Sequence, residues 1–158
     1  MSPRTIHLLL CVALVAAGCG RVPQADREAV LETVRRNVRF LEEKRIDEMM
    51  ETIHPESPAF AGTRKSVTEL TKDFDLKCEL SALEVLGARK GDVRVRFEQT
   101  TERTKGGVIE PKTRLAGVHV LRKDGVAWKI FDTEVISAEV IDPLPDEPDT
   151  AEEKVATP

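Results

Sequence analysis

The chain has 158 residues, a formal net charge of −4 and 41% hydrophobic residues, which fits one folded domain of ordinary size. The negative charge is concentrated at the end of the sequence, because residues 139–158 hold seven acidic side chains and one lysine. The middle of the chain is therefore close to neutral. It lacks the global basic field that indicates a nucleic-acid-binding protein, so we expect no nucleic-acid partner.

The first eighteen residues have the layout of a secretory signal, in which the basic residue Arg4 precedes the apolar run Leu8–Ala17. As a helix, such a run spans about 15 Å, roughly half of the hydrocarbon core of a bilayer. It is too short for a permanent membrane span. We therefore expect residues 1–18 to be removed as a signal peptide.

The end of this signal, Val15–Cys19, resembles the lipobox of bacterial lipoproteins, although Ala16 stands where leucine is commonest. The resemblance implies that Cys19 is lipidated with acyl chains such as palmitate and that residues 19–24 form a short tether. Ordinary cleavage near Ala17 and an uncleaved anchor are the alternatives. The expected location is the bacterial cell envelope, with the protein held to a membrane by its lipid and facing the periplasm or the exterior.

Apolar residues at three- and four-residue spacing predict three amphipathic helices, which begin at Ala25, Ile46 and Ser66. The second helix stops at His54-Pro55, and residues 56–62 are predicted as a loop. The third helix is placed at Ser66 because Glu69 follows three residues later, which is the pattern of a capping box.

From Leu76 onward the period changes to two, with enrichment in β-branched residues, which predicts antiparallel strands. The predicted strands are residues 76–86, 93–98, 114–122 and 126–135, with the strongest hairpin signal at Asp124-Gly125. The last two strands are apolar on both faces for part of their length, so we expect cover on both sides and consider a homodimer through the sheet. The pattern predicts an α+β fold, with three helices packed on a curved antiparallel sheet of about four strands.

The predicted domain covers residues 25–138. Residues 139–158 are rich in proline and acidic side chains, and they are predicted to form a disordered tail. Cys78 has no second unmodified cysteine with which to pair, so no disulfide is expected.

Two segments resemble the nuclear transport factor 2-like superfamily, which includes SnoaL-like proteins, ketosteroid isomerase and polyketide cyclases. They are Lys44–Met50 leading into Ile53-His54-Pro55, and the hairpin end Lys123–Asp132. The resemblance covers about residues 25–137 and implies a cone-shaped, cystatin-like roll with a pocket between the helices and the concave sheet face. Neither segment is catalytic, so the resemblance supports the fold and leaves the function open.

His119 and Asp132 are the candidate catalytic residues of this expected pocket. His119 alternates in phase with Leu121, and a half-buried imidazole can act as an acid, a base or a hydrogen-bond donor. Asp132 and Glu134 continue the face of Trp128 and could supply a carboxylate. Each candidate also has a structural interpretation. His119 is then a core histidine whose ring is hydrogen-bonded by a neighbouring group, and Asp132 and Glu134 are acids at a strand end that reach solvent.

A ligand in the cone would contact the candidate pocket residues Phe97, His119, Trp128 and Ile130. Trp128 is equally well interpreted as part of the core. The sequence contains no tyrosine, so the tyrosine-containing oxyanion hole of the isomerase branch cannot be built here.

Other chemistry-bearing patterns are absent from the sequence. After removal of the signal only His54 and His119 remain, and no His/Cys cluster has metal-ligand spacing, so we expect neither a metal nor a cofactor. His54 is interpreted as a cap at a helix end, and Cys78 as an inert thiol in a strand.

These patterns favour a non-catalytic module in the bacterial envelope that binds a small apolar ligand or another envelope protein. The alternative is an enzyme of the isomerase, dehydratase or cyclase type that uses His119 or Asp132 in the pocket. The alternative requires both side chains to share one cavity and to have a perturbed pKa. A third interpretation is a spacer or assembly subunit without a ligand, which a completely filled cone interior would favour.

Overall fold

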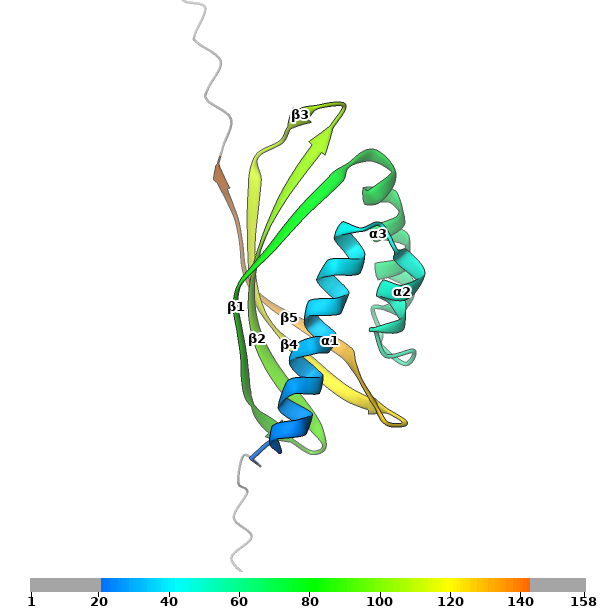
Figure 1. Cartoon of the computed structure of the whole chain (residues 1–158), viewed down its shortest axis with the longest axis vertical. Helices are drawn as coiled ribbons and strands as arrows, with labels where there is room; N and C mark the ends of the chain where they lie inside the picture. The colour runs from blue at the N-terminus through cyan, green and yellow to red at the C-terminus, as the bar shows by residue number, and fades with distance from the viewer. Residues whose placement is uncertain (1–20, 143–158) are drawn as a thin grey trace, which may run out of the picture.

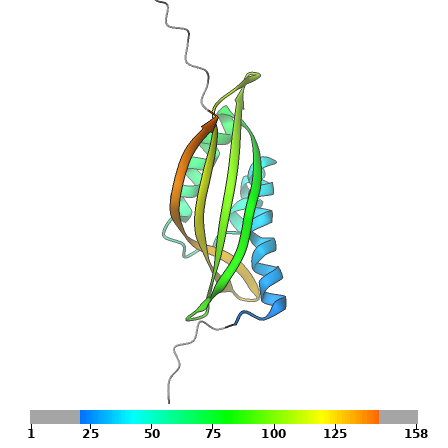
Figure 2. The same ribbon diagram turned by 90° about the vertical axis from the view of Figure 1, so that its left-hand side faces the viewer.

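The computed structural model describes residues 21–142, in which three helices lie on one side of a curved antiparallel sheet (Figures 1 and 2). The helices are α1 (Gln24–Glu42), α2 (Ile46–Glu51) and α3 (Phe60–Asp73). The strands are β1 (Asp75–Arg89), β2 (Asp92–Lys105), β3 (Val108–Ile109), β4 (Lys112–Asp124) and β5 (Ala127–Asp142).

The four long strands follow the order β1-β2-β4-β5, and the short β3 pairs with β2. The predicted α+β fold is confirmed. The sheet of the described chain has five strands where about four were expected, because two residues of the loop after β2 fold back onto that strand as β3. Neither the predicted signal peptide nor Cys19 lies within the described residues.

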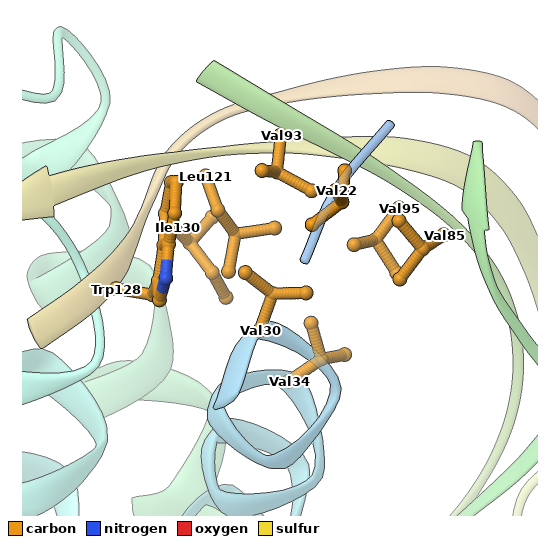
Figure 3. Close-up of a cluster of buried hydrophobic side chains, with 9 residues drawn as sticks. All are labelled: Val22, Val30, Val34, Val85, Val93, Val95, Leu121, Trp128 and Ile130. Atoms are coloured by element: carbon orange, nitrogen blue, oxygen red, sulfur yellow. The ribbon is translucent and has the colours of Figure 1, made fainter. Parts of the chain in front are cut away.

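Helix α1 forms the main core with the concave face of the sheet. Val30 and Val34 are fully buried one turn apart on this helix, and they pack against inward-facing residues of the strands (Figure 3). The cluster comprises Val22, Val30, Val34, Val85, Val93, Val95, Leu121, Trp128 and Ile130. A second, smaller cluster joins α1 to α2 through Phe40, Met49, Met50 and Ile53.

Helix α3 begins at Phe60, so its predicted start at Ser66 was wrong, as was the loop predicted up to Gly62. The helix begins earlier because Ser57 forms the preceding turn. The Ser57 carbonyl accepts the Phe60 N–H at 3.0 Å, and its hydroxyl accepts the Ala59 N–H at 3.3 Å. Phe60 then packs against the second cluster.

The folded domain is longer at both ends than residues 25–138. Val22, which was assigned to the tether, is only 5% exposed and belongs to the main core. Strand β5 continues to Asp142, so residues 139–142, which were assigned to the tail, pair with β4. The remaining tail residues, 143–158, lie outside the described part of the chain.

The outer face of the sheet is covered by charged side chains rather than by another element. Val118 points to this face, on which no helix of residues 21–142 lies, yet it is only 4% exposed. Arg96 stands directly opposite it, and Arg94 forms an ion pair with Glu134 at 2.7 Å across the face. Arginine stems are long enough to cover apolar sheet residues, which accounts for the second apolar face predicted from the sequence.

Candidate functional site

His119 and Asp132, on the neighbouring strands β4 and β5, line one cavity between the sheet and the helices. Its volume is about 190 Å³. The helices and the segment between α2 and α3 supply the opposite wall. The complete lining is Asn37, Met49, Ile53, Ser57, Ala59, Thr63, His119, Ile130, Asp132 and Thr133.

The His119 ring is held from two sides. Its Nδ1 is 2.8 Å from the Thr133 hydroxyl oxygen, and its plane stacks on Phe97 with ring centroids 4.1 Å apart. Burial disfavours the charged imidazolium and lowers the pKa of His119 to about 4. The imidazole is therefore neutral at pH 7, with one nitrogen engaged by Thr133.

A bulge at Phe131 positions the acidic residues of β5. The register with β4 shifts between the pairs Leu121–Ile130 and Val120–Asp132, so one extra residue separates Ile130 from the rest of the strand. Asp132 lies next to the cavity, where its Oδ1 accepts the Thr133 N–H at 2.8 Å.

The same bulge corrects the expectation for Glu134, which was predicted to continue the Trp128 face. The extra residue reverses the alternation of β5, and Glu134 lies on the outer face, where its carboxylate accepts a hydrogen bond from Arg94 at 2.7 Å. Asp132 pairs with Val120 on the same side of β5 as Glu134 and is exposed, so it borders the cavity only at the edge of the sheet, whereas Thr133, opposite His119, lies on the inner face.

The four predicted pocket residues separate into different environments. Ile130 and His119 line the cavity, and Phe97 lies behind the His119 ring, only 2% exposed. Trp128 does not line this cavity. It is in the main core, and its indole N–H donates to Asp26 at 2.9 Å.

The helical wall adds polar groups that the sequence interpretation missed. Asn37, Ser57 and Thr63 line the cavity opposite the sheet. Asn37 could have been found, because it falls three residues after the buried Val34, in phase with the apolar stripe of α1. Its Nδ2 donates to the Thr52 hydroxyl at 2.7 Å. Ser57 and Thr63 had no such signal, because their segment was predicted as a loop or left unassigned.

His54 has a structural role that differs from the predicted cap. It is 6% exposed, its N–H donates to the Ile130 carbonyl at 2.8 Å, and the Ile130 N–H donates to the Thr52 carbonyl at 2.9 Å. These two bonds attach the end of α2 to the free edge of β5. The His54 Nδ1 accepts the Glu56 N–H at 3.2 Å, so the ring stabilises the turn after α2. This attachment fixes the helical wall of the cavity over the sheet.

Cys78 is a partly buried thiol on β1, away from the cavity. Burial raises the pKa of Cys78, so its reactive thiolate is disfavoured. Within residues 21–142, no three His, Cys, Asp or Glu side chains form a group able to hold a metal ion. In the same residues, no helix is long and apolar enough to cross a membrane.

The arrangement of helices over a concave sheet is that of nuclear transport factor 2-like proteins with a cystatin-like fold. A proposed aromatic ring hydroxylase from Novosphingobium aromaticivorans aligns with 75% of this chain and 95% of its own, with a TM-score of 0.64 and 13% identity. The beta subunit of benzoate 1,2-dioxygenase from Burkholderia mallei aligns with 72% of this chain and 89% of its own, with a TM-score of 0.59 and 16% identity.

A ketosteroid isomerase-like protein from Erwinia carotovora atroseptica covers 73% of this chain and 99% of its own, with a TM-score of 0.57 and 14% identity. At these identities the likeness defines the fold alone. No curated protein sequence matches the chain. Residues 32–141 match the family described as anti-sigma-I factor RsgI9, C-terminal domain, and the chain belongs to this family.

Proposed function

We propose that this chain is a lipid-anchored domain of the bacterial cell envelope that holds a small ligand between its helices and its sheet. The observation that carries the proposal is the cavity in which His119 and Thr133 of the sheet face a helical wall that is also polar. The family name supports a role in recognition, because it describes one domain of an anti-sigma factor, a regulatory protein by its name.

The cavity favours a small neutral ligand that bears hydroxyl groups. Its volume of about 190 Å³ is below the roughly 300 Å³ at which drug-sized pockets begin. Apolar contacts come from Met49, Ile53 and Ile130, and hydrogen-bonding groups surround them. A ring the size of a phenol or a single sugar fits these dimensions.

The protonation state of His119 favours binding over proton transfer. A general base works best when its pKa lies near the operating pH, and the pKa of His119 is about 4. At pH 7 the neutral ring is a weak base, and its single N–H is far too weak an acid to protonate a substrate. It retains the ability to form hydrogen bonds with a ligand hydroxyl.

The competing function is an enzyme of the isomerase, dehydratase or cyclase type. One observation favours it, because His119 and Asp132 both border the cavity, Asp132 from the exposed edge of the sheet. Catalysis would depend on Asp132 as the proton acceptor, with a side-chain amide or hydroxyl group in place of the missing tyrosine. Turnover that is abolished by Asp132→Asn and retained in His119→Gln would establish this alternative.

The binding proposal is tested by blocking the cavity. In isotope-labelled protein, titration with phenol and with methyl glucoside should shift the resonances of the His119 ring and of Thr133. Thr63→Trp places an indole at the cavity wall and should abolish these shifts. Ser66→Trp adds the same side chain on the exposed side of α3 and is the matched control. Equal shifts in both variants, or none in the parent protein, would refute the site.

The anchor is tested separately at Cys19. Cys19→Ala removes the thiol that carries the lipid, so the protein should lose incorporation of labelled palmitate and leave the membrane fraction or accumulate unprocessed. Unchanged labelling and fractionation would show that this part of the proposal is wrong.

A further inference from the structure

Three segments that are distant in sequence meet at the end of the molecule where α1 begins (Figures 1 and 2). They are residues 21–28, the β1–β2 turn at 89–92 and the β4–β5 turn at 122–129. Trp128 donates a hydrogen bond to Asp26, which joins the third segment to the first. Ala88, next to the β1–β2 turn, packs against the core cluster that contains Val22. We call this surface the anchor end.

The anchor end has an excess of positive charge. Its three segments contain seven basic and four acidic residues. Asp26, Asp92 and Asp124 are each neutralised by a neighbouring cation, at 3.2, 2.8 and 2.8 Å. The fourth acid, Glu28, is exposed and accepts a hydrogen bond from Gln24 at 3.2 Å. The remaining cations are exposed or partly exposed, and they form no ion pair with any acid in residues 21–142. They are Arg21, Arg27, Arg89 and Lys90.

The same end exposes an apolar side chain at the β4–β5 turn. Val126 follows Gly125 at the tip of the β4–β5 hairpin and is 98% exposed. An isolated exposed valine is ordinary on a protein surface. Here Lys123 and Lys129 of the same turn are paired with Asp26 and Asp124, and the apolar tip stands at the same end of the molecule as the four remaining cations. An apolar side chain beside exposed basic residues is the composition of a surface that contacts lipid headgroups.

The position of Cys19 brings this surface close to a bilayer. Val22 is fixed in the core, and it follows Cys19 by three residues. Three residues of extended chain span at most about 11 Å. A lipidated Cys19 would therefore hold the anchor end, and not the side of the molecule, within about 11 Å of the membrane surface.

We propose that the anchor end docks on anionic phospholipid headgroups through Arg21, Arg27, Arg89 and Lys90, with Val126 entering the headgroup layer. The inference rests on the proposed lipid anchor and adds an orientation to it. Docking would set the long axis of the domain upright on the membrane. The far end of the domain, where β5 ends at Asp142, would then point away from the negative surface.

The experiment uses the lipidated full chain reconstituted in vesicles. One set contains phosphatidylglycerol and phosphatidylethanolamine, and the other contains phosphatidylcholine alone. The rate of chemical acetylation of Lys90 is measured by mass spectrometry, with Lys72 and Lys77 near the opposite end as internal references. We expect Lys90 to react at least fivefold more slowly in anionic than in neutral vesicles, and the reference lysines to change less than twofold.

Two charge variants separate a specific surface from net charge. Arg21→Gln, Arg27→Gln and Arg89→Gln together should remove the protection of Lys90, because each basic residue near an anionic surface contributes about fivefold to association. Lys65→Gln, Lys72→Gln and Lys105→Gln remove the same charge elsewhere and should leave the protection intact. In this control, Lys77 is the internal reference.

Each outcome has a defined meaning. Lys90 that reacts equally in both vesicle types, whether fast or slow, would overturn the electrostatic docking. Loss of protection in both variants would show that net charge, and not the anchor end, is responsible, which also overturns it. Failure of the chain to enter either vesicle set would instead refute the lipid anchor on which the inference rests.

Discussion

The ring of Phe97 lies almost parallel to the ring of His119, with an angle of 9° between the planes and 4.1 Å between the centroids. The contact connects the cavity to the core, because Phe97 is buried at 2% exposure while His119 lines the cavity. A protonated imidazole in this position would lose solvation without gaining an acidic partner. Burial is accordingly the cause of the lowered pKa of His119.

His119 is expected to make the stability of the domain depend on pH. Its folded-state pKa of about 4 lies below the ordinary 6.5, so the unfolded chain binds the proton more readily. The free energy of unfolding should therefore fall as the pH drops from 6.5 towards 4. At pH 5 the free energy of unfolding should be lower than at neutral pH by about 2 kcal/mol through His119 alone.

The measurement is urea unfolding of the parent protein and of His119→Gln at pH 7.5 and pH 5. Both proteins lose stability in acid through their carboxylates, so the informative quantity is the difference between them. The parent should lose about 2 kcal/mol more than His119→Gln. Parallel losses would show that the histidine is not buried in its neutral form.

Gly117 is expected to be intolerant of a side chain because β4 approaches its neighbours closely there. A Cβ at this position would lie 2.6 Å from the Glu134 carbonyl oxygen and 2.9 Å from the Phe97 ring. The first of these atoms is backbone, so the strand pairing itself must shift. Gly117→Ala should destabilise the domain by about 1–3 kcal/mol and alter the His119 ring resonances.

Gly62→Ala is the matched control. This glycine lies inside α3, and nothing stands within 4 Å of the added Cβ. Because alanine favours helix over glycine, the substitution should stabilise the protein by about 0.5–1 kcal/mol. Calorimetry on both variants checks the pair, and a neutral Gly117→Ala would mean that the strand has more room than the structure gives it.

Strand β5 shows how far the positions of the site residues could be predicted from the sequence. Alternation in this strand placed Trp128 and Ile130 on the inner face, and both are buried. The same alternation failed beyond Phe131, because a bulge leaves no sequence pattern of its own and reverses the faces of the residues that follow. Asp132 and Glu134 were both assigned to the wrong face for this reason.

The helical half shows a second limit of sequence interpretation. The spacing of Ser66 and Glu69 resembles a capping box, yet both residues lie inside α3. A local pattern indicates where a helix can begin, and tertiary contacts decide where it does. Here the packing of Phe60 against the second core cluster extends the helix towards Ser57. The cavity residues of this segment could therefore not be predicted.

Val22 is expected to behave as a core residue although it precedes the first helix. It is 5% exposed and packs in the cluster with Trp128 and Val85. Val22→Ala should lower the free energy of unfolding by about 1–2 kcal/mol. Ala25→Ser, an exposed change three residues later, should have no measurable effect. Equal stability of both variants in urea would show that Val22 belongs to a free tether, as the sequence had indicated.

Lys44 is the position where a glycine should improve the fold. It has a φ of 57° directly after α1, where the Arg45 N–H donates to the Phe40 carbonyl at 2.8 Å and closes the helix end. A side chain in this left-handed region costs about 1 kcal/mol, which Lys44→Gly would recover.

The ion pair between Lys44 and Asp75, at 2.6 Å, opposes this gain, but both side chains are at least 40% exposed. An exposed pair of this kind contributes little, because solvent screens it and two flexible side chains must be ordered. Lys44→Gly should therefore raise the melting temperature, whereas Lys44→Ala, which loses the pair and keeps the strained φ, should not. If Lys44→Gly and Asp75→Asn lower the melting temperature equally, the ion pair outweighs the backbone strain at this helix end.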